Sequence, residues 1–95
     1  MIEYLYDAIR ATAGEEMAIA AKIVDDNGNP ITTGCHFNLY DDNEMINKTD
    51  GVYADGVWTF TVPAEATAEL RGRYWYCICS ETHTKLNFKQ PIYLV

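Results

Sequence analysis

Apolar side chains recur at every second position through most of this chain, and segments rich in Gly, Pro, Asn and Asp interrupt the pattern. A period of two belongs to β-strands, whose successive side chains point to opposite faces of a sheet. The strictest alternation covers residues 57–62, where Trp58, Phe60 and Val62 are predicted to face the interior before Pro63 ends the strand. The chain is therefore predicted to be all-β.

The pattern predicts about seven strands, separated by turn signals at intervals of about 8–12 residues. Besides 57–62, they cover residues 2–12, 17–23, 35–40, 45–48, 73–80 and 85–95. Within the first of these, residues 8–11 could instead carry a helical turn. Met17, Ile19 and Ile23 are expected on the buried face of the second.

The two last strands carry signals about their place in a sheet. The strand at 73–80 is apolar on both faces, so we expect it at the centre, with Tyr74, Tyr76 and Ile78 inside. Proline cannot donate a backbone hydrogen bond, so Pro91 implies an edge position or a bulge for the strand at 85–95.

The segments between the strands have the composition of turns. Residues 25–30 (DDNGNP) are predicted to reverse the chain at Asn27-Gly28, and residues 41–44 (DDNE) form a second acidic turn. Gly51 and Asp55-Gly56 are expected to bracket the short run Val52-Tyr53. Residues 64–70 are good helix formers followed by a glycine, which predicts one or two helical turns.

The composition fits one domain spanning residues 1–95. The chain is 48% apolar and 13% aromatic, which is far from the composition of disordered proteins. A chain of this length can bury a single core without a metal or a disulfide framework. Short strands with almost no helix favour an antiparallel two-sheet sandwich, because each sheet must hide one apolar face.

The charge balance excludes several classes of partner. Fourteen acidic side chains against seven basic ones give a formal charge of −7. Nucleic acid and anionic membrane surfaces would repel such a chain, and no apolar run approaches the roughly 20 residues needed to span a bilayer. The opening residues lack the pattern of a secretion signal, so we expect cytoplasmic synthesis.

Three cysteines make an odd set, for which reduced thiols are the expected state. A bond from Cys35 to Cys77 or Cys79 stays open. Cys77 and Cys79 are expected to point the same way from one strand, without the geometry to bridge each other. A zinc site drawn from these three and His83 lacks the usual Cys-x-x-Cys spacing, so no metal or cofactor is predicted.

No catalytic residues are predicted either. The 25–30 segment opens like a calcium loop, but its sixth position is Pro30 where a glycine is required. The acidic residues at 41–44 have no apolar neighbours that would raise a carboxyl pKa. His36 and His83 could serve Cys35 or Cys79 as bases, yet no nucleophile elbow accompanies them. The chain is therefore expected not to be an enzyme.

Exposed aromatic side chains are the remaining candidates for function. Trp75 lies on the face of its strand that the core does not need, and Tyr40 and Tyr53 are further candidates for an interaction surface. Such rings stack on sugars, so a glycan is one possible ligand. A covering strand or a second subunit is the interpretation that we favour, because unpaired sheet edges and apolar faces promote association. A homo-oligomer is therefore expected.

Residues 70–76 (LRGRYWY) resemble the tyrosine corner of immunoglobulin-type sandwiches, with Gly72 two residues before Tyr74. The resemblance implies an immunoglobulin-like sandwich in which the Tyr74 hydroxyl bonds upstream backbone. Antibody domains have a cysteine two residues after this tyrosine. Here that position is Tyr76, so the resemblance does not extend to their disulfide.

The order of features from about residue 10 onward resembles the immunoglobulin-like domains of tailed-phage structural proteins, particularly the N-terminal domain of baseplate upper proteins. The matching features are Gly14-Glu15, the turn at 25–30, the strand at 35–39, the segment 56–63 that ends in proline, and the GRYWY run at 72–76. The resemblance implies a virion assembly module that contacts other virion proteins or itself. The alternative is a carbohydrate-binding or adhesin-type module.

Overall fold

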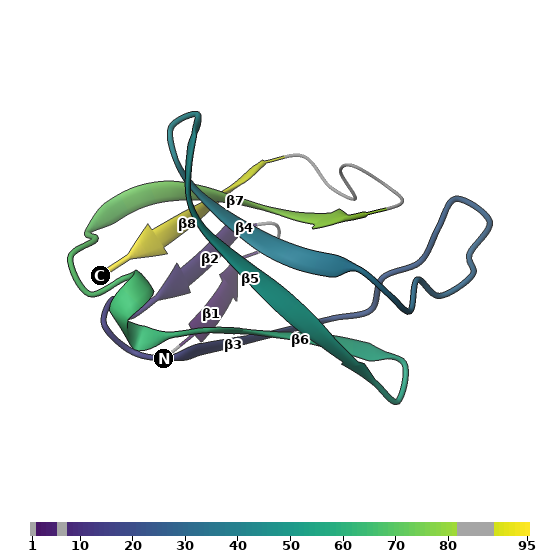
Figure 1. Cartoon of the computed structure of the whole chain (residues 1–95). Coiled ribbons are helices and arrows are strands. Elements are labelled where there is room, and N and C mark those ends of the chain that lie inside the picture. Colours follow the sequence, from purple (N-terminus) through teal and green to yellow (C-terminus); the bar gives the residue numbers. More distant parts are fainter. Residues whose placement is uncertain (1, 6–7, 82–88) are drawn as a thin grey trace.

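A computed structural model shows the fold, and it describes residues 2–5, 8–81 and 89–95 (Figure 1). The strands are β1 (Ile2–Leu5), β2 (Ala8–Ala11), β3 (Met17–Ala21), β4 (Cys35–Asp41), β5 (Glu44–Ala54), β6 (Val57–Val62), β7 (Gly72–Ser80) and β8 (Gln90–Leu94). In the described residues they form one eight-stranded sheet in the order β1-β2-β8-β7-β4-β5-β6-β3. The all-β prediction is confirmed.

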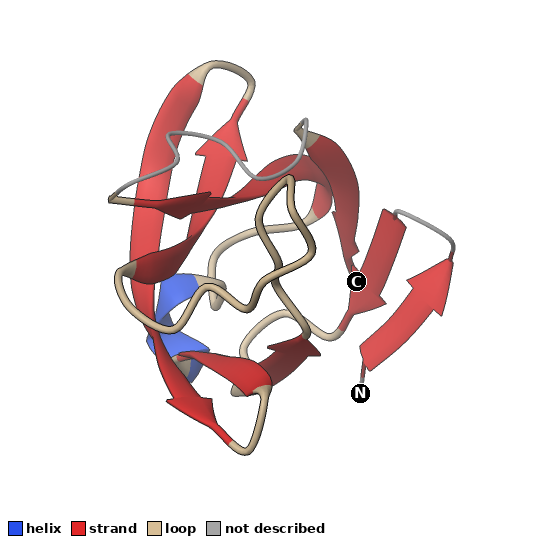
Figure 2. Cartoon of the chain, turned by 90° about the vertical axis from the view of Figure 1, so that its right-hand side faces the viewer, coloured by secondary structure: helices blue, strands red, loops and turns tan. Residues whose placement is uncertain are grey.

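The sheet curls so that its two halves face each other across the core (Figure 2). β5 belongs to both halves, because it pairs with β4 on one side and with β6 on the other. Phe37 on β4 and Phe60 on β6 meet in the middle, with ring centroids 6.3 Å apart. The two predicted layers are therefore parts of one continuous sheet.

Gly51 does not separate Val52-Tyr53 from the residues before it, as the sequence suggested, but lies inside β5; only Asp55-Gly56 forms a turn. It is paired with Phe60, and a Cβ atom at this position would lie 2.6 Å from ring carbons of both Trp58 and Phe60. The glycine is needed for close approach to these rings, and the strand runs on through it. Residues 45–48 and 52–53 thus belong to one strand.

The first predicted strand is wrong in its extent. Residues 2–12 form two strands, β1 and β2, which pair antiparallel from Ile2–Ala11 to Leu5–Ala8. Residues 6 and 7 lie outside the described part. Because residues 8–11 are a strand, the helical alternative for them is also wrong. β2 then runs parallel to β8, so the sheet is mixed instead of purely antiparallel.

The core contains the side chains that the alternation predicted. Trp58, Phe60 and Val62 of β6 are buried, as are Met17 and Ile19 of the neighbouring β3. The indole N–H of Trp58 donates a 2.6 Å hydrogen bond to the carbonyl oxygen of Ile31. This bond ties the loop before β4 to the core.

The loops follow the predicted turn chemistry, and the predicted short helical turn is present. Asp25 Oδ1 accepts hydrogen bonds from the backbone N–H groups of Asn27 and Asn29, both 2.9 Å, which confirms a turn at this site. Within residues 64–70 there is one 3-10 turn, η1 (Ala64–Ala66). Thr67 follows it and is fully buried, and its Oγ1 accepts a 3.0 Å bond from the Gly14 N–H.

β7 is central, as predicted, because it pairs with β4 on one side and β8 on the other. Residues 85–88 of the last predicted strand lie outside the described part. β8 is also paired on both sides, so the predicted edge position is wrong. However, β2 pairs only with Ile92–Leu94 of β8, and Pro91 precedes these residues. No hydrogen bond to β2 is therefore lost because proline has no backbone N–H.

Candidate functional site: the outer face of β8, β7 and β4

Apolar and aromatic side chains form a row across four strands on the side of the sheet that faces away from the core. Pro91 of β8 is opposite Trp75 of β7, which is opposite Tyr40 of β4, which is opposite Met45 of β5. Directly paired residues share one face of a sheet. Met45 is 49% exposed, so the row reaches solvent at its β5 end.

A second row lies beside the first and carries positive charge. Arg10 of β2 is paired with Tyr93 of β8, and Tyr93 is paired with Arg73 of β7. Arg10 also contacts Glu3 of β1, with 3.1 Å between the guanidinium and the carboxylate. We call the two rows together the outer face; its members are Arg10, Tyr40, Met45, Arg73, Trp75, Pro91 and Tyr93.

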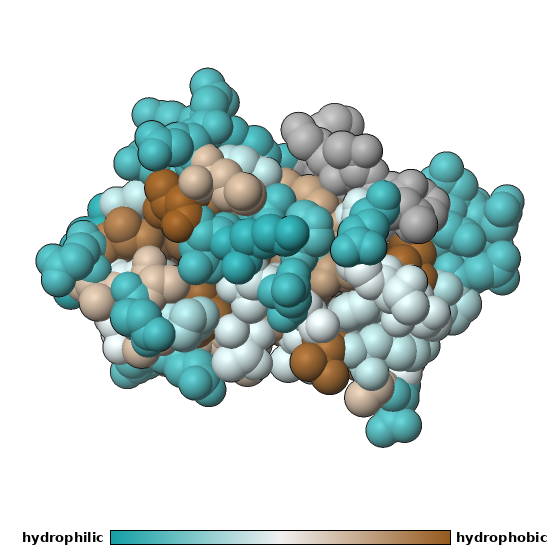
Figure 3. Space-filling view, viewed as in Figure 1, coloured by the Kyte–Doolittle hydropathy of each residue, from teal (hydrophilic) through white to brown (hydrophobic). Residues whose placement is uncertain are grey.

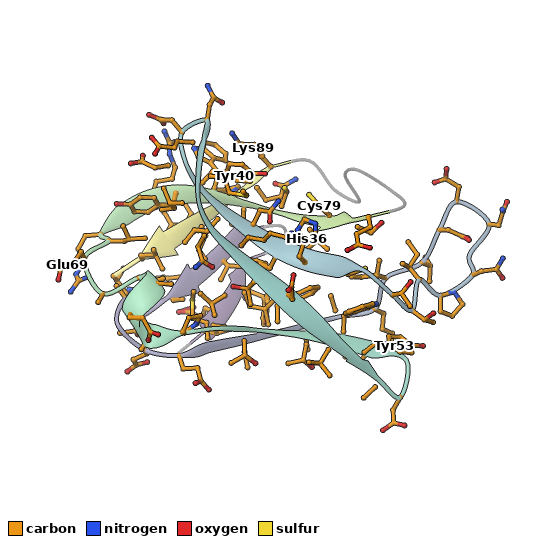
Figure 4. The ribbon with its side chains drawn as sticks, in the orientation of Figure 1. His36, Tyr40, Tyr53, Glu69, Cys79 and Lys89 are labelled. Atoms are coloured by element: carbon orange, nitrogen blue, oxygen red, sulfur yellow. The ribbon has the colours of Figure 1, made fainter. Side chains whose placement is uncertain are left out.

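Two cations lie over the rings of this face. The Arg73 guanidinium is 5.2 Å from the ring centroid of Trp75, and the Lys89 ammonium is 4.8 Å from that of Tyr40. Lys89 Nζ also donates to the Asp42 carbonyl oxygen at 2.6 Å and to Asn43 Oδ1 at 3.2 Å. Figure 4 shows Tyr40 and Lys89 side by side near the tip of the β4–β5 hairpin. These contacts hold the rings in fixed positions.

A shallow hollow of about 460 Å³ opens beside these rings, lined by Asp42, Asn43, Trp75 and Lys89. It combines an aromatic side chain with a carboxylate, an amide and an ammonium group. The face of the molecule shown in Figure 3 is mostly hydrophilic or neutral, with apolar residues as separate spots.

A polar network continues from Tyr40 along β4 and β7. His36 Nδ1 donates to Asn38 Oδ1 at 2.9 Å, and Asn38 Nδ2 donates to the Tyr40 hydroxyl at 3.3 Å and to Cys79 Sγ at 3.5 Å. Cys77 Sγ lies 3.5 Å from the Tyr40 hydroxyl and 3.3 Å from Cys79 Sγ. The Cys77 contact, followed by burial, raises the pKa of Tyr40 above its ordinary value of 10.0.

The third cysteine lies on the opposite side of the sheet. Cys35 belongs to the core cluster, together with Phe37 and Leu39 of the same strand, and burial raises the pKa of its thiol. Cys77 and Cys79 lie on the other face of the sheet, so Cys35 pairs with neither of them, and no disulfide joins any two of the three cysteines. The zinc set drawn from the sequence does not converge, because Cys35 points the wrong way; its fourth member, His83, lies outside the described residues.

The structure brings together two of the three predicted surface residues. Tyr40 and Trp75 are direct cross-strand partners. Tyr53 lies in the other half of the sheet, where its ring packs against Trp58 at 5.5 Å between centroids. It is separate from the outer face, because its pairing with Trp58 directs it inward.

The two residues of the predicted tyrosine corner, Gly72 and Tyr74, lie at the start of β7. Gly72 begins β7 with a φ of 101°, a conformation that favours glycine. Tyr74 is half-buried and packs against the core cluster. The bond from its hydroxyl to upstream backbone stays a prediction.

Sequence reasoning missed most members of the outer face. Arg73 shares the alternation of Trp75 and could have been found from period two alone. Met45 and Tyr93 could not, because their places in the two rows depend on the pairing of β4 with β5 and of β7 with β8. Asn38 was missed for the same reason.

Residues 2–5, 8–81 and 89–95 contain no group of three or more His, Cys, Asp or Glu side chains that could hold a metal ion. No helix within these ranges has the length and hydropathy of a membrane span.

Comparisons of the chain with protein-family models, with curated proteins and with solved structures found no match.

Proposed function

We propose that this chain is a non-enzymatic assembly module that binds a protein partner through the outer face. The observation that carries the proposal is the pair of adjacent rows, in which Trp75 and Tyr40 lie beside a band of arginine and tyrosine side chains. Protein interfaces are enriched in Tyr, Trp, Met and Arg, and Trp, Tyr and Arg dominate their binding energy.

The rings of the outer face are ordered before any partner binds. Arg73 holds one side of Trp75, and Lys89 holds Tyr40 to the hairpin that contains Asn43. Side chains fixed in this way lose less conformational entropy on binding, which leaves more of the contact energy as affinity.

The charge distribution indicates which kind of partner fits. Arg73 and Lys89 supply positive charge to this face, although the chain as a whole carries −7, whereas the charge of Arg10 is balanced by its ion pair with Glu3. A partner with an acidic patch is therefore complementary. A second copy of the chain has such patches at the acidic turns, residues 25–26 and 41–44, which makes self-association the first case to test.

The sequence resemblance supports a biological context for this module. Immunoglobulin-like domains of tailed-phage structural proteins assemble through protein contacts, and we propose that this chain does so in a phage or prophage virion of the tail or baseplate type. Its partners are then other virion proteins or further copies of itself.

Sedimentation equilibrium at micromolar concentration tests the proposal. We expect wild-type chains to self-associate, and the substitution Trp75→Ala to weaken the association at least tenfold, corresponding to about 1.4 kcal/mol. Val52→Ala is the matched control, because Val52 is 68% exposed on β5 and lies outside the outer face. A wild-type chain that stays monomeric and binds no virion protein contradicts the proposal.

A second candidate function rests on the hollow beside Trp75. Its Asp42, Asn43 and Lys89 side chains offer hydrogen-bonding groups next to an aromatic face, an arrangement that suits a sugar ring. Glycan binding here would quench Trp75 fluorescence, and Trp75→Phe would remove that signal while Trp58 continues to fluoresce. Unchanged emission across a broad panel of cell-wall and host glycans excludes this candidate.

A further inference from the structure

The two outward-facing cysteines of β7 lie unusually close together. Cys77 Sγ and Cys79 Sγ are 3.3 Å apart, whereas a disulfide bond measures about 2.0 Å. The sequence interpretation held that residues two apart on a strand lack the geometry to bridge. In the structure both side chains point the same way, as expected, but their sulfur atoms are already in contact.

We propose that Cys77 and Cys79 form a modification site, at which a reversible disulfide closes within β7 on the side of the sheet that carries the outer face. The third cysteine takes no part, because Cys35 lies in the core on the other side of the sheet. The inference is independent of the assembly function proposed above.

A regular strand does not allow this bond unless its backbone bends. Each residue of a strand advances the chain by about 3.3 Å, so the Cα atoms of residues two apart are separated by roughly 6.6 Å, and so are the Cβ atoms, which point the same way. Disulfides span Cα separations of about 4.4–6.8 Å but Cβ separations of only about 3.5–4.5 Å, so closing the bond requires β7 to bend between the two cysteines and leaves the bond strained. A bond formed there is expected to be readily reduced, as strained disulfides are.

The neighbouring side chains favour Cys79 as the first thiol to react. It is 6% exposed, whereas Cys77 is fully buried. Asn38 Nδ2 lies 3.5 Å from Cys79 Sγ, where its N–H can donate to a negatively charged sulfur. Cys77 lies behind it at 3.3 Å, in the position of a resolving thiol.

The oxidant is a low-molecular-weight disulfide such as oxidised glutathione. Cys79 Sγ loses its proton and attacks one sulfur of the oxidant, which forms a mixed disulfide and releases one glutathione thiolate. Cys77 Sγ then loses its proton and attacks Cys79 Sγ, which closes the bond and expels the second thiolate. The two cysteines lose two electrons and two protons, and two molecules of reduced glutathione gain them.

Peptide mapping after equilibration in glutathione buffers tests the proposal. Cleavage after Arg73 and Lys85 places both outward-facing cysteines in one peptide, residues 74–85, and Cys35 in another. Three proteins are compared: wild type, Cys35→Ala, which keeps the pair, and Cys79→Ser, which removes it. Circular dichroism establishes that each stays folded, and acid quenching followed by alkylation traps the thiols.

We expect the 74–85 peptide of wild type and of Cys35→Ala to lose two hydrogen atoms on oxidation and to regain them in reduced glutathione. In Cys79→Ser the peptide should carry a free or glutathione-modified Cys77 only. The proposal is overturned if both thiols stay open to alkylation in folded protein. It is also overturned if each binds its own glutathione, if the bond joins Cys35 or a second chain, or if an excess of reduced glutathione does not reopen the bond.

Discussion

Adding one methyl group at Gly51 tests the path of β5 across the core. In Gly51→Ala the new Cβ would lie 2.6 Å from Trp58 Cε3 and from Phe60 Cε1. Ordinary carbon–carbon contacts are about 3.5 Å or longer, so the overlap is about 0.9 Å with each ring. Neither ring has room to move. Both are buried, they stack on each other at 6.1 Å, and the Ile31 carbonyl holds the indole.

Two opposing effects set the magnitude. Overpacking of a core costs about 1–3 kcal/mol. Replacing glycine by alanine restricts the unfolded chain, which stabilises a protein by about 0.4–1 kcal/mol where the site accepts the side chain. Overpacking is the larger effect, and we expect a net loss of about 1–2 kcal/mol in the free energy of unfolding.

Urea denaturation followed by far-ultraviolet circular dichroism measures this loss. A domain of this size should also melt about 4–8 °C lower for each kcal/mol lost. Val52→Ala is the control in the same strand, and because Val52 is 68% exposed its effect should stay within about 0.5 kcal/mol. If Gly51→Ala is as stable as wild type or more so, β5 does not pass over the two rings and the continuous strand is refuted.

Three further predictions concern hydrogen bonds and thiols. Trp58→Phe leaves the Ile31 carbonyl without its 2.6 Å donor and should cost about 1–3 kcal/mol in urea denaturation; an unchanged midpoint would show that the bond contributes nothing. The raised pKa of Tyr40 means that the folded state favours the neutral hydroxyl. The stabilisation that the folded protein gains from this preference is complete below pH 10, and it is lost as the pH rises through the pKa that Tyr40 has in the folded state. Tyr40→Phe should therefore lose less stability than wild type when urea midpoints are compared above pH 10, and parallel losses would contradict this sign. The raised pKa of Cys35 and its place in the core cluster should make its thiol alkylate more slowly than that of Cys79 in folded protein, which timed mass spectrometry measures, and equal rates would contradict this order.

Local alternation predicted the parts of this fold that depend on one strand at a time. β6 is such a case, because Trp58, Phe60 and Val62 face inward wherever the strand is placed. β7 is another, since its apolar residues predicted a central strand, and β4 and β8 flank it within the sheet.

The wrong predictions concern residues whose place in the fold depends on which strands pair with each other. Residues 2–12 read as one alternating strand, but they fold back as a hairpin whose second strand joins β8. Glycine is common in turns, but Gly51 lies inside a strand, where the rings of Trp58 and Phe60 leave no room for a Cβ atom. No local pattern distinguishes a glycine that ends a strand from one that lets two layers approach. The same limit applies to Tyr53, whose inward direction follows from its pairing with Trp58.

The candidate site also combines residues that the alternation within one strand predicts with residues that only the pairing of strands brings together. Period two places Trp75 on the face opposite Tyr76, and Tyr76 already fills the core, with its ring stacked on Phe37 at 5.2 Å. Trp75 is therefore not needed to complete the interior. Its neighbours on that face are Tyr40 and the two thiols, and none of these belongs to the core cluster. The thiols are buried within the chain, whereas the rings of Trp75 and Tyr40 are only half-buried. Exposed aromatic surface on central strands adds a risk of aggregation unless something covers it. The assembly proposal gives that surface a cover, and the substitution at Trp75 separates the two roles, because it should weaken association while leaving the packing around Tyr76 and Phe37 in place.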